Sequence, residues 1–119
     1  MLRRFTVIAL AALGVAACGG AAIPTEQMTA AQAALRAAEV GGAQENPQAS
    51  LHLKHASDQI ESARLLIEDG ENERALWVLR RAEVDAEVAL ALAKEQSLAN
   101  EARAAMEELE RMKKKAVSN

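Results

Sequence analysis

Two histidines on one predicted helix are the residues with the most evident capacity for metal chemistry. His52 and His55 lie three residues apart, Gln59 follows on the same helical face, and Asp58 lies within one turn of His55. A zinc site needs three or four ligands at bonding distance, and neither a spare cysteine nor a second histidine pair supplies the others. We therefore interpret both histidines as surface residues beside an apolar stripe, with no metal site. A metal-binding or enzyme accessory protein is the weaker alternative.

Carboxylates are the second group that could do chemistry. General acid–base catalysis needs a carboxylate held in a pocket that shifts its pKa. Here the carboxylates stand at ion-pair spacing from basic residues, so we predict that they lie on solvated helix faces. The carboxylates are Glu68, Asp69, Glu83, Asp85, Glu87, Glu107 and Glu108, and the basic residues are Arg80, Arg81, Lys94 and Arg111. The chain has no Gly-rich phosphate loop and no G-x-S-x-G motif, so we expect neither catalytic activity nor a cofactor.

Cys18 is the only cysteine, and the residues before it are organised like an export signal. Met1 to Arg4 is short and basic, and an uncharged apolar run follows from Phe5 to Val15. A run of roughly a dozen residues suits a signal-peptide core, whereas a helix that spans a bilayer needs about 20. We therefore predict that residues 1–17 are a signal peptide.

The residues Val15, Ala16, Ala17 and Cys18 resemble the lipobox of bacterial lipoproteins, in which a branched residue and two small ones precede the modified cysteine. The resemblance implies cleavage before Cys18, a diacylglycerol on its thiol and an acyl chain on the new amine. Two or three chains anchor a protein stably where one is marginal. Gly19, where an aspartate would resemble an inner-membrane retention signal, implies the periplasmic side of the outer membrane. The alternative is an ordinary secretory signal that happens to contain a cysteine.

The remaining chain predicts a tether followed by helices. Alanine is abundant, and Trp77 is the only aromatic residue after the signal peptide, which favours helices packed through small side chains over a sheet. Residues 18–24 are expected to be a flexible tether. A first helix is predicted over 25–40, capped by Thr25 or Thr29 and ended by two glycines. Its apolar stripe consists of Met28, Ala31, Leu35 and Ala38.

Two further helices follow. Asn46, with a proline after it, predicts the start of a helix over 47–69, which Asp69-Gly70 closes. Asn72 is expected to cap a third helix over 72–115, roughly 66 Å long at 1.5 Å per residue. Residues 116–119 are predicted to be a disordered tail.

The second and third predicted helices carry mirror-related apolar stripes. When the chain is folded back at Glu71, almost every large residue of one stripe faces a small residue of the other, which lets two antiparallel helices interlock. The pairs are Ile67 with Ala75, Ala63 with Leu79, Ile60 with Ala82, Ala56 with Ala86, Leu53 with Ala89, and Ala49 with Ala93. We predict an all-α fold, an antiparallel helical hairpin that the first helix completes to a three-helix bundle against Leu66, Val78, Val88 or Leu92.

Beyond Gln96 the third helix overhangs this hairpin and still carries apolar residues at four-three spacing. These are Leu98, Ala102, Ala105, Leu109 and Met112. Either the overhang frays as a charged tail, or it self-associates or docks onto another envelope protein. Trp77 lies off the paired stripes, either packed over the first helix or exposed as a contact residue. The basic end at 113–115 complements the helix dipole or touches an anionic polymer.

The segment 47–96 resembles the lipoprotein family described as domain of unknown function 4398. The resemblance rests on Ala63-Arg64, on the turn at 69–71, on Arg74-Ala75 and most closely on the run 82–87. Members of that family are small helical lipoproteins of Gram-negative envelopes. No activity is established for them, so the resemblance implies location and fold only.

These patterns together predict a non-catalytic structural or adaptor lipoprotein of the cell envelope. Its expected partners are the membrane, through the lipids on Cys18, and an envelope protein or a second copy, through the overhang. The net charge of −3 excludes a general nucleic-acid binder, because neutralising phosphates needs clustered basic residues. One alternative is a tether between peptidoglycan and the outer membrane similar to the major murein lipoprotein. Such proteins end in the lysine joined to peptidoglycan, whereas this chain ends at Asn119.

Overall fold

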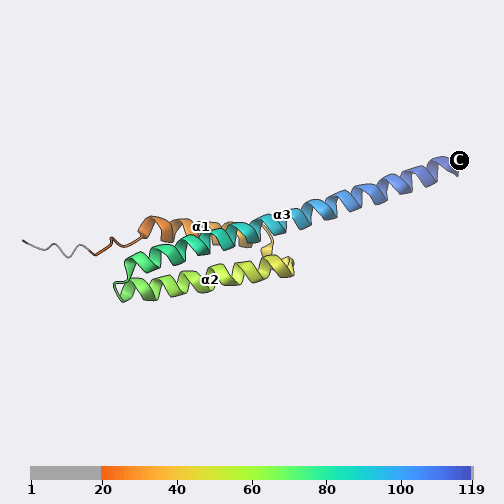
Figure 1. The fold of residues 1–119 in the computed structure, drawn as a ribbon. Coiled ribbons are helices and arrows are strands. Elements are labelled where there is room, and N and C mark those ends of the chain that lie inside the picture. The colour runs from red at the N-terminus through yellow and green to blue at the C-terminus, as the bar shows by residue number, and fades with distance from the viewer. Residues whose placement is uncertain (1–19, 119) are drawn as a thin grey trace, which may run out of the picture.

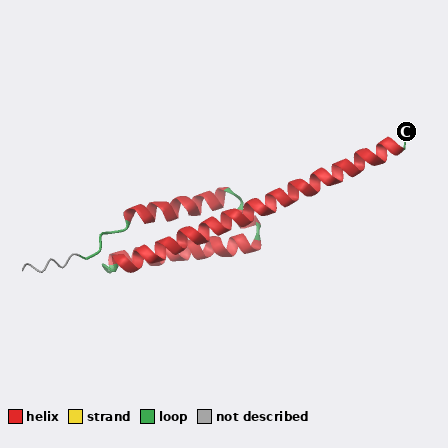
Figure 2. Cartoon of the chain, turned by 45° about the horizontal axis from the view of Figure 1, so that its top comes forward, coloured by secondary structure: helices red, strands yellow, loops and turns green. Residues whose placement is uncertain are grey.

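The chain folds into three helices, and the third is far longer than the others (Figure 1). The computed structural model describes residues 20–118. Its elements in order are α1 (Thr25–Val40), the short 3₁₀ helix η1 (Ala43–Glu45), α2 (Pro47–Glu68) and α3 (Asn72–Val117). Residues 20–118 contain no strand, and α2 runs antiparallel to both α1 and α3 (Figures 1 and 2). The predicted all-α fold, with its hairpin and long C-terminal helix, is confirmed.

Local hydrogen bonds fix both ends of α2. The Asn46 side-chain oxygen accepts hydrogen bonds from the backbone N–H groups of Gln48 and Ala49, at 2.9 and 3.0 Å, so this predicted cap is confirmed. At the other end Gly70 adopts a φ of 77°, which a residue with a side chain rarely adopts. Its N–H and that of Glu71 bond back to carbonyls of the last helical turn, at 3.0 and 2.8 Å. This turn reverses the chain into α3.

The predicted caps of the other two helices are wrong. The Thr29 hydroxyl donates to the carbonyl of Thr25 within α1, at 3.0 Å, and no side chain caps that helix. Asn72 is the first residue of α3, and its side-chain amide donates instead to the carbonyl of Ala21, at 2.7 Å. The helix ends also shift slightly: α2 stops one residue before the predicted end, and α3 continues through 116–117, which the sequence assigned to a disordered tail.

The mirror stripes of α2 and α3 form the core of the hairpin. Among residues 20–118, Leu79 is the largest side chain with no exposed surface. Ile67 is half-buried, and the other eleven stripe residues are all buried: Ala49, Leu53, Ala56, Ile60, Ala63, Ala75, Leu79, Ala82, Ala86, Ala89 and Ala93. Because each of the four large side chains has an alanine as its predicted partner, the two helices can approach closely without leaving voids.

The first helix completes the bundle by packing mainly against α3. It buries Ala31 and Ala38 fully and its Met28 and Leu35 in part. Leu66, Val78 and Leu92 are half-buried around the same clusters, as predicted. A side chain at Gly41 would collide with Leu90 of α3, so the glycine lets the end of α1 come close to that helix.

Beyond Ala93 the third helix leaves the bundle and continues alone (Figures 1 and 2). Every residue from 94 to 118 is exposed, although 94–117 stays helical. We call residues 94–118 the overhang. At 1.5 Å per residue its helical part is about 36 Å long.

Candidate interaction surface on the third helix

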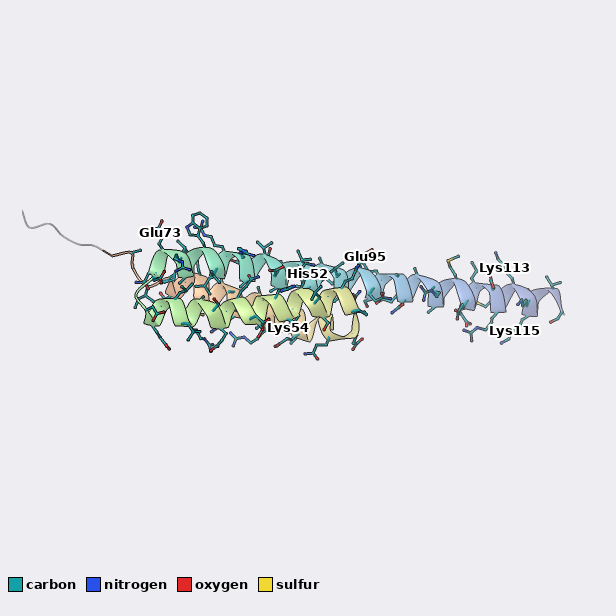
Figure 3. All side chains as sticks on the ribbon, turned by 60° about the horizontal axis from the view of Figure 1, so that its bottom comes forward. His52, Lys54, Glu73, Glu95, Lys113 and Lys115 are labelled. Atoms are coloured by element: carbon teal, nitrogen blue, oxygen red, sulfur yellow. The ribbon has the colours of Figure 1, made fainter. Side chains whose placement is uncertain are left out.

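The apolar residues predicted at four-three spacing beyond Gln96, which we call the seam, lie on the overhang and face solvent. Leu98 is 65% exposed, Leu109 48% and Met112 53%. Ala102 and Ala105, which complete the seam, are exposed as well. Met106, which the sequence analysis did not single out, adds a further exposed apolar side chain. Figure 3 shows the side chains of this half of α3 projecting outward along its whole length.

The seam does not continue the buried stripe of α3. Ala93 is the last buried residue, and Leu98 follows five positions later rather than three or four. At 3.6 residues per turn, a step of five rotates the stripe by about 140° around the helix. Beyond Ala93, the positions that continue the core face carry Ser97, Asn100, Ala104 and Glu107, with no large apolar side chain among them. The bundle stripe therefore ends where the bundle ends, and a separate apolar stripe occupies another face.

Trp77 is exposed, so the alternative that it packs over α1 is wrong. The side chain is 57% exposed, and the Arg80 guanidinium lies 5.1 Å from the centre of its ring, within the range of a cation–π contact. Both residues line an open hollow of about 520 Å³ together with Arg81, Val84 and Asp85. An exposed tryptophan beside arginines is the combination that protein interfaces favour.

The most connected polar group of the bundle is one that sequence reasoning missed. Asp85 of α3 accepts hydrogen bonds from two side chains of α2, His52 Nδ1 at 2.9 Å and Gln59 Nε2 at 2.7 Å. Asp85 and Gln59 are half-buried, whereas His55 is exposed. The prediction that the carboxylates lie on solvated faces is thus wrong for Asp85, and His52 is more than a surface residue. The group links the two helices of the hairpin.

The surroundings of Asp85 favour its charged form. Burial acts to raise the pKa of Asp85, but the hydrogen bonds from His52 and Gln59 and the charges of His52 and His55 outweigh it, so the pKa lies below the ordinary 3.8. The predicted pairing of α2 with α3 could have located this group. Asp85 directly precedes Ala86, which pairs with Ala56, and His52 and Gln59 lie four residues before and three residues after Ala56. Both side chains therefore lie on the edge of α2 beside Asp85.

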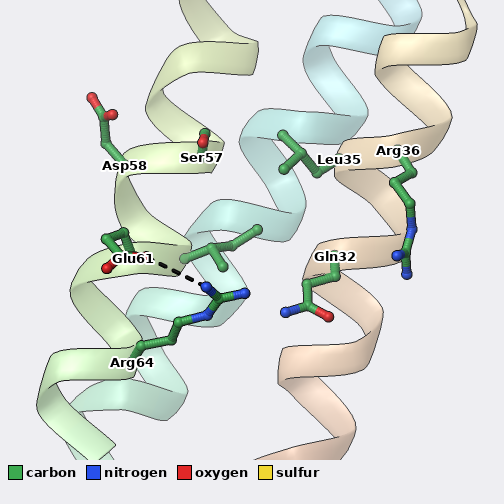
Figure 4. A pocket seen from close by; sticks show the side chains of 8 residues that line it. Gln32, Leu35, Arg36, Ser57, Asp58, Glu61 and Arg64 are labelled. Atoms are coloured by element: carbon green, nitrogen blue, oxygen red, sulfur yellow. Dashed lines mark ion pairs between the residues drawn. The ribbon is translucent and has the colours of Figure 1, made fainter.

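A second hollow lies between α1 and α2, since both helices pack against α3 more than against each other. It measures about 500 Å³ and is open to solvent. Leu35 and Ile60 provide its apolar lining, and the polar lining comes from Gln32, Arg36, Ser57, Asp58, Glu61 and Arg64 (Figure 4). Two of these lining residues, Arg64 and Glu61, form an ion pair at 3.5 Å (Figure 4). None of the polar or charged residues within 20–118 is buried, so the polar lining of this hollow remains in contact with water.

The described residues were also compared with what a metal site and a membrane-spanning helix require. Within residues 20–118, no three His, Cys, Asp or Glu side chains lie close enough to hold a metal ion together. None of the helices in this range has both the length and the apolar composition needed to cross a membrane.

The predicted lipid-attachment residues Val15, Ala16, Ala17 and Cys18 lie outside the described residues. The described part of the tether is held at two points rather than free along its length. Ala21 accepts the hydrogen bond from Asn72, and Pro24 is buried. The tether thus meets the bundle beside the α2–α3 turn, at the end opposite the overhang (Figure 1).

Fold and surface together define a small three-helix bundle with a projecting helix that carries an exposed apolar stripe. Comparison with protein families identifies the chain further. It belongs to the family described as Domain of unknown function (DUF4398), whose model matches residues 26–105. The match covers the bundle from the second residue of α1 and the first part of the overhang, so it reaches further at both ends than the resemblance seen in the sequence. Searches of curated proteins and of solved structures found no match.

Proposed function

We propose that this chain is a lipoprotein anchored on the periplasmic side of the outer membrane through acyl chains on Cys18. There it acts as a non-catalytic adaptor that presents the apolar stripe of α3 to a protein partner. The observation that carries the proposal is the sequence Val15-Ala16-Ala17-Cys18 after a basic and then apolar segment. The resemblance of segment 47–96 to a family of small helical lipoproteins of Gram-negative envelopes supports the same location.

The position of the tether supports the adaptor role. Because Asn72 holds Ala21 beside the α2–α3 turn, an anchor at Cys18 would attach to the end of the bundle opposite the overhang. The part of the exposed stripe on the overhang, from Leu98 onward, would then begin a full bundle length away from the attachment point. A partner could reach the overhang without competing with the anchor for space.

The test of the anchor is metabolic labelling with a radioactive fatty acid, followed by separation of inner and outer membranes on a density gradient. Wild-type protein is expected to carry label and to sediment with the outer membrane. Cys18→Ser should lose the label and leave the membrane while keeping its helical circular dichroism. Gly19→Asp is the matched control, since it should keep the label and move to the inner membrane. Membrane-bound Cys18→Ser would refute the anchor.

A further inference from the structure

The exposed stripe of α3 is longer than the overhang and repeats every seven residues. Six residues share one heptad position and are all exposed: Trp77, Val84, Ala91, Leu98, Ala105 and Met112. In the overhang, apolar residues also follow four positions after this set, at Ala102, Leu109 and Ala116. A seven-residue apolar repeat is the pattern by which two helices wind around each other in a left-handed coiled coil.

The stripe is accessible without any change in the bundle. The loop between α1 and α2 lies near the start of the overhang, where Gly41 and Asn46 share a hollow with Gln96, Ser97 and Asn100. None of the stripe residues lines that hollow. A second helix can therefore lie along Leu98, Ala105 and Met112 on the free side of α3.

We propose that the occupant of the overhang part of this stripe, from Leu98 to Ala116, is the overhang of a second copy of the chain, running antiparallel. In the register we infer, Leu109 of one copy packs against Ala105 of the other, Met112 against Ala102, and Leu98 against Ala116. Every layer then joins a large side chain to a small one, which keeps the helix separation constant. The α2–α3 hairpin follows the same rule, with Ile60 opposite Ala82 and Leu79 opposite Ala63 in one core cluster.

Side-chain size disfavours a parallel, in-register pair. That arrangement would set Leu98 against Leu98 and Ala102 against Ala102, so layers of two large residues would lie next to layers of two alanines. It would also place Glu95 against Glu95 at a core position of the repeat, where a buried like-charge pair is costly.

Charge disfavours the parallel pair as well. The end of α3 is basic, with Arg111 and Lys113–Lys115, and a parallel pair would bring two such ends together. The antiparallel register moves each basic end beside residues 99–103 of the other copy, where Lys115 lies near Glu101.

The antiparallel register has one unfavourable contact, which sets Glu108 of one copy near Glu108 of the other at the two-fold axis of the pair. Glu108→Gln should therefore strengthen the antiparallel pair, whereas it would weaken a parallel one by removing Glu108 from Lys113 of the second copy.

The antiparallel register also fixes how far apart the two bundles lie. Asn72 of one copy and Asn72 of the other would be separated by about 105 Å along the paired helices, at 1.5 Å per residue. If the anchor proposed above holds, one membrane can hold both copies only with α3 lying along its surface. Pairing of the overhangs does not itself require the anchor, so the two proposals can fail separately.

The first experiment measures the mass of the purified full chain carrying Cys18→Ser by light scattering across a concentration series. We expect a monomer–dimer equilibrium. Leu109→Arg should remain monomeric, and Ala104→Arg, which places the same charge at an exposed position on another face of the overhang, should dimerise like the parent chain. A parent chain that stays monomeric at every concentration, or equal dimerisation of Leu109→Arg, overturns the proposal.

The second experiment determines the direction of pairing with one spin label per chain in the same Cys18→Ser background. Labels at Glu87→Cys should lie about 60 Å apart along the axis in the antiparallel pair and side by side in a parallel pair. Labels at Glu107→Cys, close to the two-fold axis, should lie near each other in either arrangement and report that pairing occurred. A short distance at residue 87 contradicts the antiparallel register.

Discussion

The two halves of α3 contain similar amino acids in different environments. From Ala75 to Ala93 the apolar residues of one face are buried against α1 and α2, whereas from Lys94 to Ser118 every residue is exposed. Both halves are helical. The difference shows that helical propensity extends the helix, while complementary large and small residues on a second helix decide which part of it becomes a core.

The largest expected effect is a cavity in the bundle half. Leu79→Ala removes the largest side chain that has no exposed surface, so we expect the free energy of unfolding to fall by about 2–5 kcal/mol. Leu98→Ala, the same change on the overhang, should lower it by less than about 0.5 kcal/mol in dilute protein. Urea denaturation followed by circular dichroism measures both. Equal losses would remove the distinction between the halves.

Overpacking provides a second contrast. Ala63 is fully buried opposite Leu79, and Ala63→Leu should destabilise the fold by about 1–3 kcal/mol because two large residues would meet in one layer. Ala102→Leu adds the same atoms to the exposed stripe. It should leave the melting temperature of dilute protein unchanged within a few degrees. A loss of stability from Ala102→Leu would mean that the overhang already packs against its own chain.

The cap of α2 is expected to contribute less. Asn46→Ala should cost about 1 kcal/mol, because the side-chain oxygen satisfies two backbone N–H groups at the start of the helix. Asn100→Ala is the control on the overhang, where the asparagine oxygen accepts from the side chain of Gln96 one turn away, at 3.1 Å, and caps no helix. Thermal unfolding of the two variants should differ clearly. If Asn100→Ala costs as much, capping does not explain the loss.

The smallest effect concerns Asp85 and pH. Because the pKa of Asp85 is lowered in the folded state, its contribution to stability is present above the ordinary 3.8 and is lost as the pH falls through and below that value. Between about pH 6 and about pH 3, the parent chain should therefore lose more stability than Asp85→Asn, by less than about 1 kcal/mol. Melting temperatures across this range measure the difference. Glu107→Gln, on the exposed half, should follow the parent curve.

The sequence predicted the bundle well because its main determinant is local and periodic. The stripes of large and small residues on the two sides of a single turn determine the α2–α3 register. Asn46 and Gly70 mark the ends of α2 through a side-chain cap and a positive φ, which depend only on neighbouring residues. The caps predicted at Thr29 and Asn72 failed for a physical reason. The helices begin earlier than these caps require, because Pro24 and Glu71 hold the N-cap positions, so Thr29 and Asn72 lie inside α1 and α3. Their side chains donate instead to the carbonyls of Thr25 and Ala21.

The candidate surface was only partly predictable. The apolar residues of the overhang were visible in the sequence, and the five-residue step between Ala93 and Leu98 already rotates them away from the bundle face. What the spacing within α3 does not specify is that every residue from Lys94 onward is exposed. The exposure of Trp77 depends on where α1 packs, which spacing within α3 does not specify. The contacts of Asp85 join residues 26 and 33 positions apart, so they follow only after the hairpin register is applied.

Hydrogen exchange at single amides tests most directly whether one half of α3 is held by the bundle and the other by a second copy. We predict that amides of 75–93 exchange only through global unfolding at every protein concentration. Amides of 98–115 should exchange quickly in dilute protein, because a lone helix of this length is marginal in water, and should become protected as the concentration rises. Strong protection of 98–115 in dilute, monomeric protein would contradict this division of the helix.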